Sequence, residues 1–223
     1  MHIGSQLLDL APFRAAYRRI ADVTRELRAQ GHTVSHLDLG GGMGITYEDE
    51  TPPDLNAYAQ LVREEVGDLG CDLSVEPGRM LVGNAGILAT QVLHVKQGGE
   101  RRFLIADAAM NDLIRPTLYS AEHQVVAVDQ SDSPSESGPA DLVGPICESG
   151  DYLARNRTLP DVGAGTCLAL MSAGAYGAVM SSTYNSRPLI PEVLVHGNNF
   201  ACVRPRPSVE DLISQDRLPD WLS

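Results

Sequence analysis

The sequence LDLGGGMGI, residues 37–45, places three consecutive glycines directly after a short apolar stretch. We expect a buried strand over residues 34–39, because apolar side chains recur within it up to the glycines. Glycines at a strand end let backbone N–H groups approach an anion closely, so Gly40, Gly41 and Gly42 are candidate phosphate ligands. A plain turn between a strand and a loop explains the same three glycines.

Two amphipathic helices are expected on either side of this strand, over residues 12–30 and 53–69, and a second short strand over residues 73–75. Pro12 suits the start of the first helix, and Gly31 suits its end. The apolar faces consist of Phe13, Tyr17, Ile20, Thr24 and Leu27 in the first helix and of Leu55, Tyr58, Leu61, Val62 and Val66 in the second. Alternating strands and helices indicate a parallel sheet or barrel. A closed barrel takes roughly 250 residues, so this part supplies the last few strands of a barrel or a small open sheet.

Short strands with few helices between them are expected after about residue 90, which indicates a mostly antiparallel β domain. The candidates are residues 91–95, 103–106, 124–129, 142–146, 168–172 and 191–196. Residues 130–140 are rich in Ser, Pro, Asp and Glu and are typical of an exposed hairpin tip. Ser208 and Asp211 form a capping-box pattern that predicts a short terminal helix. We therefore predict an α/β domain over residues 1–90 and a β domain over residues 91–223.

Composition excludes several classes of protein. The net charge of −12 is unfavourable for binding nucleic acid or an anionic membrane surface. No apolar run is long enough to span a bilayer, and no signal peptide is visible. The four cysteines are widely spaced, which argues against disulfides and a metal site and fits the cytoplasm. Lys96 is the only lysine, and we expect it on the surface of a strand.

Polar residues that could bind a cofactor or take part in catalysis lie at both ends of the α/β part. In EPGR, residues 76–79, the Glu76 carboxylate can pair with a protonated ring nitrogen and the Arg79 guanidinium can bind phosphate or carboxylate. In HIGSQ, residues 2–6, the imidazole of His2 can stack on a flat cofactor and Ser5 can donate to phosphate. A structural Glu–Arg pair and a frayed terminus are the alternative interpretations.

Further polar motifs interrupt the β half: RPTLY (115–119), CESGD (147–151), GAYG (174–177) and SSTYNSRP (181–188). Taken in order with HIGSQ, LDLGGGMGI and EPGR, they resemble the group IV decarboxylases of the alanine-racemase-like fold, which depend on pyridoxal 5′-phosphate (PLP). CESGD and RPTLY are similar to the diaminopimelate decarboxylase branch in particular. The resemblance extends from His2 to about Leu212, and it implies the C-terminal part of a PLP-binding (β/α)8 barrel followed by the β domain.

The resemblance also implies a role for each matched residue. His2 would stack on the pyridine ring, and Glu76 would pair with the ring nitrogen, which favours the protonated ring that withdraws electrons. The residues implied at the phosphate are Ser5, Gly40, Gly41, Gly42, Arg79 and Tyr176.

The substrate implied by the resemblance is meso-2,6-diaminopimelate, which is decarboxylated to L-lysine in the last step of lysine biosynthesis. Its far end carries a carboxylate and an ammonium group, and ornithine and arginine lack that carboxylate. Glu148 would bind the ammonium group, and Cys147 would donate the proton in catalysis. The other substrate-binding residues implied are Arg79, Arg115, Tyr119 and Tyr176. CESGD would reach into a partner's site, which implies a homodimer with shared active sites.

The family binds PLP through a lysine on an early barrel strand, and the segment that carries it is expected to be missing from these 223 residues. An open half-barrel exposes strand edges, so we expect the chain alone to be poorly stable or prone to associate. Three hypotheses remain open. The chain is part of an active decarboxylase, or a non-catalytic subunit that associates through its β domain, or part of a related decarboxylase for a polyamine or carrier-bound substrate.

Overall fold

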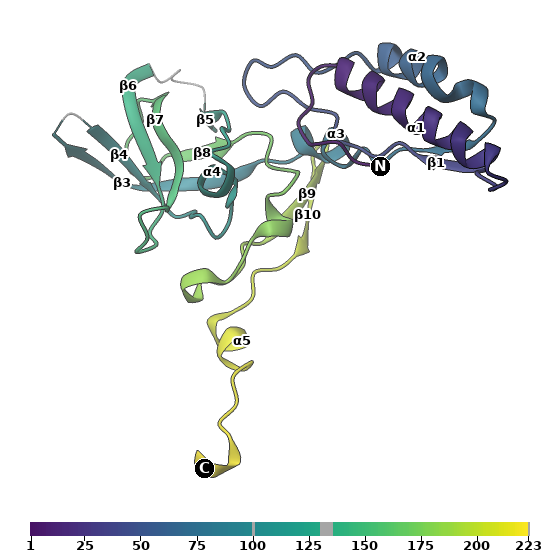
Figure 1. The fold of residues 1–223 in the computed structure, drawn as a ribbon. Coiled ribbons are helices and arrows are strands. Elements are labelled where there is room, and N and C mark those ends of the chain that lie inside the picture. The colour runs from purple at the N-terminus through teal and green to yellow at the C-terminus, as the bar shows by residue number, and fades with distance from the viewer. Residues whose placement is uncertain (100, 130–135, 223) are drawn as a thin grey trace. The chain divides into compact units, whose positions relative to one another are not determined.

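The computed structural model describes residues 1–99, 101–129 and 136–222 (Figure 1). The chain divides into two compact units, the first formed by Met1–Ile87 with Met171–Ala175 and the second by Leu88–Leu170 with Tyr176–Ser223. Residues 171–175 thus lie with the first unit, outside the range 1–90 that the sequence predicts for it. Among the described residues, no helix has the length and apolar character needed to cross a membrane.

The first unit alternates strands and helices, as predicted from its pattern. Its elements are α1 (Ala11–Ala29), β1 (His36–Asp38), α2 (Leu55–Val66), β2 (Asp72–Ser74) and α3 (Gly78–Val82), with 3₁₀ turns at Gly67–Leu69 and Gly83–Ala85. β1 pairs with β2 in parallel, and Leu7 forms a parallel bridge with Met43. The predicted helices and strands are confirmed with small shifts of their ends, whereas the short helix α3 was not predicted.

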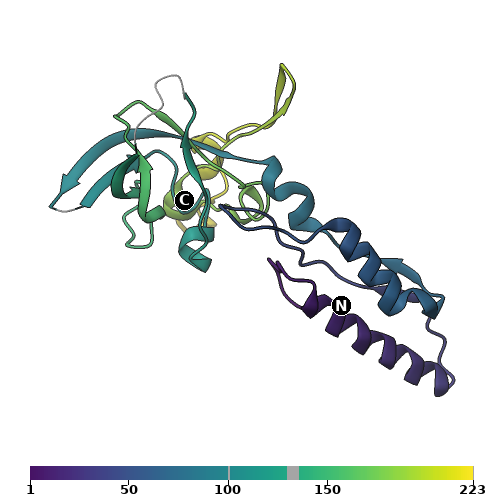
Figure 2. The same ribbon diagram turned by 90° about the horizontal axis from the view of Figure 1, so that it is seen from above.

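The core of the first unit is formed by side chains of α1, α2 and the segment of β1. Figure 2 shows the ribbons of this unit from above. Phe13, Tyr17, Leu61 and Val66 are almost completely buried there. The hydroxyl groups of Tyr17 and Tyr58 are 2.8 Å apart, and burial raises the pKa of Tyr17 far above its usual value. Two residues of the predicted apolar faces, Leu27 and Leu55, are exposed instead, since both stand at helix ends beyond this core.

The second unit is built on a six-stranded sheet in the order β5-β8-β3-β4-β6-β7, with a separate two-stranded sheet of β9 and β10. The strands are β3 (Leu88–Gly98), β4 (Arg101–Ala106), β5 (Val125–Ala127), β6 (Glu136–Val143), β7 (Tyr152–Pro160), β8 (Cys167–Leu170), β9 (Glu192–His196) and β10 (Asn199–Arg204). Only the pairing of β4 with β6 is parallel among these described strands. The mostly antiparallel sheet is therefore confirmed.

The described part of this unit also contains the short α-helices α4 (Arg115–Tyr119) and α5 (Val209–Ile213), and 3₁₀ turns at Ala178–Met180, Tyr184–Ser186 and Asp220–Leu222. The capping box at α5 is confirmed, because Ser208 accepts from the Asp211 amide and the Asp211 carboxylate accepts from the Ser208 amide. α4 was not predicted, since five residues are too few to show a helical period.

Several strand predictions in this unit need correction. β6 lies earlier than the predicted residues 142–146, because the strand ends at Val143 and the chain bends from Pro145 onward. The hairpin tip predicted over 130–140 falls in part on residues 130–135, which lie outside the described residues, and its end belongs to β6. β7 was missed because its YLARNRTLP sequence does not alternate, and Asn156 within it has a left-handed φ of 53°. β10 was also missed.

Candidate functional site

Three parallel chain segments end at one edge of the first unit. The Met1 amino group donates to the Asp38 carbonyl at 2.6 Å, which aligns the N-terminal segment with β1. On the other side of β1, the Leu39 amide donates to Ser74 O at 2.9 Å and the Glu76 amide donates to Gly40 O at 2.9 Å. Because parallel strands have their carboxyl ends at the same edge, HIGSQ, the glycine run and EPGR lie close together.

The glycines are needed because neighbouring backbone comes very close to them. A Cβ on Gly41 would lie 2.1 Å from Glu76 O, and one on Gly42 would lie 2.1 Å from Gly4 O. Gly42 also has a left-handed φ of +105°. The glycine run therefore does more than end a strand. Its missing side chains let the backbone of HIGSQ pack against it on one side and the backbone of EPGR on the other.

The amides of the glycine run differ in their hydrogen bonding. Gly40 donates to Asp38 Oδ1 at 2.7 Å, so its amide is engaged within the protein. Within the described residues, the amides of Gly41 and Gly42 have no hydrogen-bond acceptor. The His2 ring borders Gly42, because a Cβ there would lie 3.6 Å from His2 Cε1. Two available amides beside an exposed flat ring fit a phosphorylated aromatic cofactor such as PLP.

Arg79 links two of these loops. Its Nη2 donates to Ser5 Oγ at 2.9 Å, and its Nη1 donates to the hydroxyl of Tyr47. Tyr47 is buried, and sequence reasoning missed it although it follows the glycine run closely. Arg79, Ser5 and the exposed side chain of Glu76 thus complete a polar edge in the first unit.

The second unit joins the RPTLY and CESGD motifs. Thr117 Oγ1 donates to Gly150 O, and the Tyr152 hydroxyl donates to Pro116 O at 3.3 Å. Asp151 anchors the turn, since its carboxylate accepts from the Met110 amide at 2.7 Å and from the Ile146 amide at 2.6 Å. Asp151 was not predicted as a site residue. Its place in CESGD was visible in the sequence, but its acceptor role was not.

The predicted residues on these two motifs differ in exposure. Cys147, Glu148 and Tyr119 are exposed, and Glu148 accepts from the Gly150 amide at 3.2 Å and faces the Tyr184 hydroxyl at 3.5 Å. Arg115 is only 6% exposed. An interior arginine that keeps a small open surface is already oriented before any ligand arrives.

Tyr176 and Lys96 belong to the same unit. Tyr176 is exposed and has a left-handed φ of 58°, an uncommon conformation for a bulky side chain. Lys96 is exposed on β3, opposite Phe103 of β4, which confirms it as a surface strand residue.

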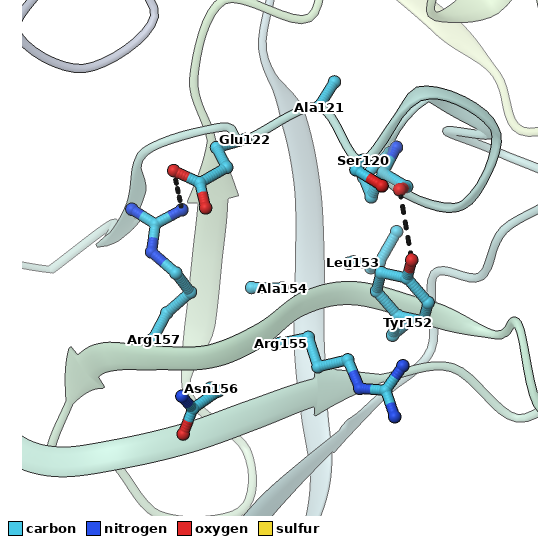
Figure 3. Close-up of a pocket in the computed structure, with 10 residues that line it drawn as sticks. Ser120, Ala121, Glu122, Tyr152, Leu153, Ala154, Arg155, Asn156 and Arg157 are labelled. Atoms are coloured by element: carbon cyan, nitrogen blue, oxygen red, sulfur yellow. Dashed lines mark hydrogen bonds and ion pairs between the residues drawn. The ribbon is translucent and has the colours of Figure 1, made fainter.

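A hollow of about 350 Å³ in the second unit contains none of the predicted site residues (Figure 3). Its floor is β7, where Arg157 pairs with Glu122 at 3.2 Å and Arg155 lies over the Tyr152 ring at 5.5 Å. The motifs therefore do not converge on this hollow, and it does not form part of the candidate site.

Replacing Asp151 with alanine is expected to destabilise the second unit by about 2–3 kcal/mol, since two interior amides lose a carboxylate acceptor. Urea unfolding followed by circular dichroism measures the change. Asp161→Ala is the matched control, because that exposed carboxylate only pairs with Arg102 at the surface and should cost at most about 1 kcal/mol. Equal losses in the two variants would contradict the anchoring role.

Comparison with known proteins adds evidence independent of this geometry. A family model described as "Pyridoxal-dependent decarboxylase, C-terminal sheet domain" matches residues 15–174. A diaminopimelate decarboxylase of Zymomonas mobilis is 49% identical over 223 residues, which cover 99% of this chain and 52% of that protein.

Two solved structures are similar in fold as well as in sequence. The diaminopimelate decarboxylase of Helicobacter pylori in complex with L-lysine matches 96% of this chain with a TM-score of 0.89 and 41% identity. That of M. jannaschii matches the whole chain with a TM-score of 0.93 and 34% identity. In each case the match covers 52% of the relative, so the chain spans about half the length of these proteins.

Proposed function

The chain belongs to the pyridoxal-dependent decarboxylases, and from this premise we propose that it supplies the C-terminal half of a diaminopimelate decarboxylase. The reaction would convert meso-2,6-diaminopimelate to L-lysine and CO2. The observation that supports it most directly is the pair of available amides at Gly41 and Gly42, set between HIGSQ and EPGR. The relatives that match this chain at 49% identity are named diaminopimelate decarboxylase.

The cofactor would be held by residues of the first unit. PLP, when bound, supplies an electron sink for the bond that breaks. Gly41, Gly42 and Ser5 would donate to its phosphate, and His2 would cover one face of its ring. The Glu76 carboxylate would keep the ring nitrogen protonated by its negative charge. Gly40 would act through its backbone position, since its amide already donates to Asp38.

Residues of the second unit would select the substrate. Arg115 and Tyr119 on α4, and Tyr176, would bind the far carboxylate, for which a guanidinium is well suited. Arg79 of the first unit would bind either the phosphate or a substrate carboxylate. Glu148 would bind the far ammonium group.

Cys147 Sγ would hold the proton that replaces the lost carboxylate. Its place in an exposed turn next to Glu148 supports access to substrate.

The complete enzyme would be a PLP-binding (β/α)8 barrel with the β domain, working as a cytoplasmic homodimer with shared active sites. The exposed turn that carries Cys147 and Glu148 supports a role in a partner's site. Lys96, exposed on β3, is poorly suited to hold PLP, so we propose that the lysine comes from a segment equivalent to the other half of the relatives. Size-exclusion chromatography with light scattering of the complete enzyme tests the dimer.

Release of CO2 from meso-diaminopimelate tests the function. We expect none from the purified chain with PLP, and release once the chain is fused behind the N-terminal half of the Zymomonas mobilis relative. Ornithine and arginine serve as substrate controls and should react far more slowly. A fusion that binds PLP but releases no CO2 from any of the three would favour the non-catalytic hypothesis. Preference for ornithine would favour a related decarboxylase.

A further inference from the structure

His123 lies in the interior beside Arg115. It is 1% exposed and follows α4 in the chain, and its Nε2 is 2.8 Å from Arg115 Nη1. The distance is that of a good hydrogen bond between two nitrogen atoms. Of the residues predicted to contact substrate, Arg115 is the one whose guanidinium has an interior imidazole at this distance.

The chemistry of the two groups decides the direction of this hydrogen bond. A guanidinium stays protonated and has only donors, so Arg115 donates and His123 Nε2 accepts. The imidazole is then neutral, with its proton on Nδ1. The neutral imidazole of His123 orients the Arg115 guanidinium, and this contact does not cancel the positive charge. A carboxylate in place of the imidazole would form an ion pair with no net charge.

The backbone of α4 is held independently of this contact. Thr117 donates to Gly150 O, and the Ala121 amide donates to Arg115 O at 3.4 Å. These bonds fix where the Arg115 side chain starts but not where its end points, because arginine has several freely rotating bonds. The contact with His123 gives the end of the side chain a partner in the interior at 2.8 Å.

We propose that His123 is a positioning residue that directs the Arg115 guanidinium, and through it sets the preference for a substrate whose far end carries a carboxylate. This inference rests on the proposed function, because it takes Arg115 as a ligand of that carboxylate. His123 itself touches neither the substrate nor the reacting atoms in this scheme.

Three substitutions separate positioning from simple filling of space. His123→Gln keeps an oxygen acceptor near the position of Nε2, His123→Asn holds the same amide one methylene shorter, and His123→Leu fills the space without an acceptor. In the fused enzyme we expect His123→Asn and His123→Leu to raise KM for meso-diaminopimelate about tenfold, with little change in kcat. Tenfold is the effect of losing one hydrogen bond to a charged group. The KM of His123→Gln should stay within about threefold of the parent value, since this variant keeps the hydrogen bond.

Two product-like inhibitors provide a second readout. L-lysine and cadaverine differ only by one carboxylate, so the ratio of their inhibition constants reports recognition of that group. The ratio should fall in His123→Asn and His123→Leu and persist in His123→Gln. Equal KM values for His123→Gln and His123→Asn, or a fall in kcat with KM unchanged, would overturn the positioning role. This comparison holds even when His123→Leu fails to fold.

The imidazole ¹⁵N spectrum of the 223-residue chain distinguishes failure of this inference from failure of the proposed function. We expect one pair of ¹⁵N resonances to be absent from the spectrum of His123→Gln, which assigns that pair to His123. Its shifts should be those of a protonated Nδ1 and an unprotonated Nε2. The opposite tautomer would overturn the contact itself. If the spectrum is as expected but the fused parent releases no CO2, the proposed function fails, and the substrate role of His123 fails with it.

Discussion

Replacing Gly41 with alanine should remove PLP binding and strongly destabilise the first unit. The new Cβ would lie 2.1 Å from Glu76 O, far inside van der Waals contact. The carbonyl is held in place, because it accepts a hydrogen bond from the Gly78 amide at 2.9 Å. We expect a loss of about 3 kcal/mol or more, at the upper end for overpacking. Urea unfolding of the chain measures stability, and PLP absorbance in the fused enzyme measures binding.

Gly78→Ala is the matched control for this substitution. Gly78 lies in the neighbouring EPGR motif at the start of α3, and no atom lies within 4 Å of a Cβ built on it. Alanine there should be neutral or stabilise by up to about 1 kcal/mol, because it favours helix more than glycine does. If both variants keep parental stability and PLP affinity, the close approach at Gly41 is not what the glycine run provides.

The first unit could be predicted well because its information is local. α1 and α2 show a helical period over several turns, and the strands follow from the glycines and short apolar stretches beside them. The function of the glycines could not be decided in the same way. It depends on Gly4 and Glu76 approaching from either side, and such contacts between distant residues leave no period in the sequence.

The second unit was predicted less completely for the same physical reason. β7 follows a turn and carries arginines and a left-handed Asn156, so no alternation marks it. The parallel pairing of β4 with β6 joins strands that are separated in the chain by α4 and β5. The site motifs were visible as polar clusters, but the anchoring of Asp151 and the contact of Arg115 with His123 needed the structure.

The SSTYNSRP motif shows this limit most clearly. Its Arg187 was visible as part of a polar cluster, but its partners lie on the distant segment 107–112. Arg187 Nη2 donates to Asp107 O at 2.6 Å, its Nε donates to Asn111 Oδ1 at 3.0 Å, and its Nη2 is 3.6 Å from Asp112 Oδ2. Arg187 therefore fastens the SSTYNSRP segment to the loop that precedes α4.

Arg187→Leu should destabilise the second unit by about 3–5 kcal/mol at neutral pH, because it removes the guanidinium that pairs with the interior carboxylate of Asp112 at 3.6 Å. Asp112 is 2% exposed, and burial raises its pKa above the usual value of 3.8, while Arg187 and Arg206 act against that rise. Removing Arg187 therefore raises the pKa of Asp112 in the folded protein further. Urea unfolding at a series of pH values measures the effect.

The sign of the pH dependence follows from this shift. Between 3.8 and the raised pKa, the folded protein holds a proton on Asp112 that the unfolded chain has released. Stability therefore falls as pH rises through this window, and it falls further in Arg187→Leu than in the parent. The loss of unfolding free energy caused by Arg187→Leu should be smallest at the acid end of this pH window and largest at pH values above it.

Two controls separate the buried charge from general damage to the loop. Arg187→Leu combined with Asp112→Asn should lose the extra pH dependence, because no carboxyl remains to titrate. Arg25→Leu should cost under about 1 kcal/mol, since the pair of Arg25 with Asp68 is exposed. A loss in Arg187→Leu that is the same at every pH, with or without Asp112, would mean that the hydrogen bonds to Asn111 and Asp107 O carry the stabilisation and that the charge of Arg187 does not.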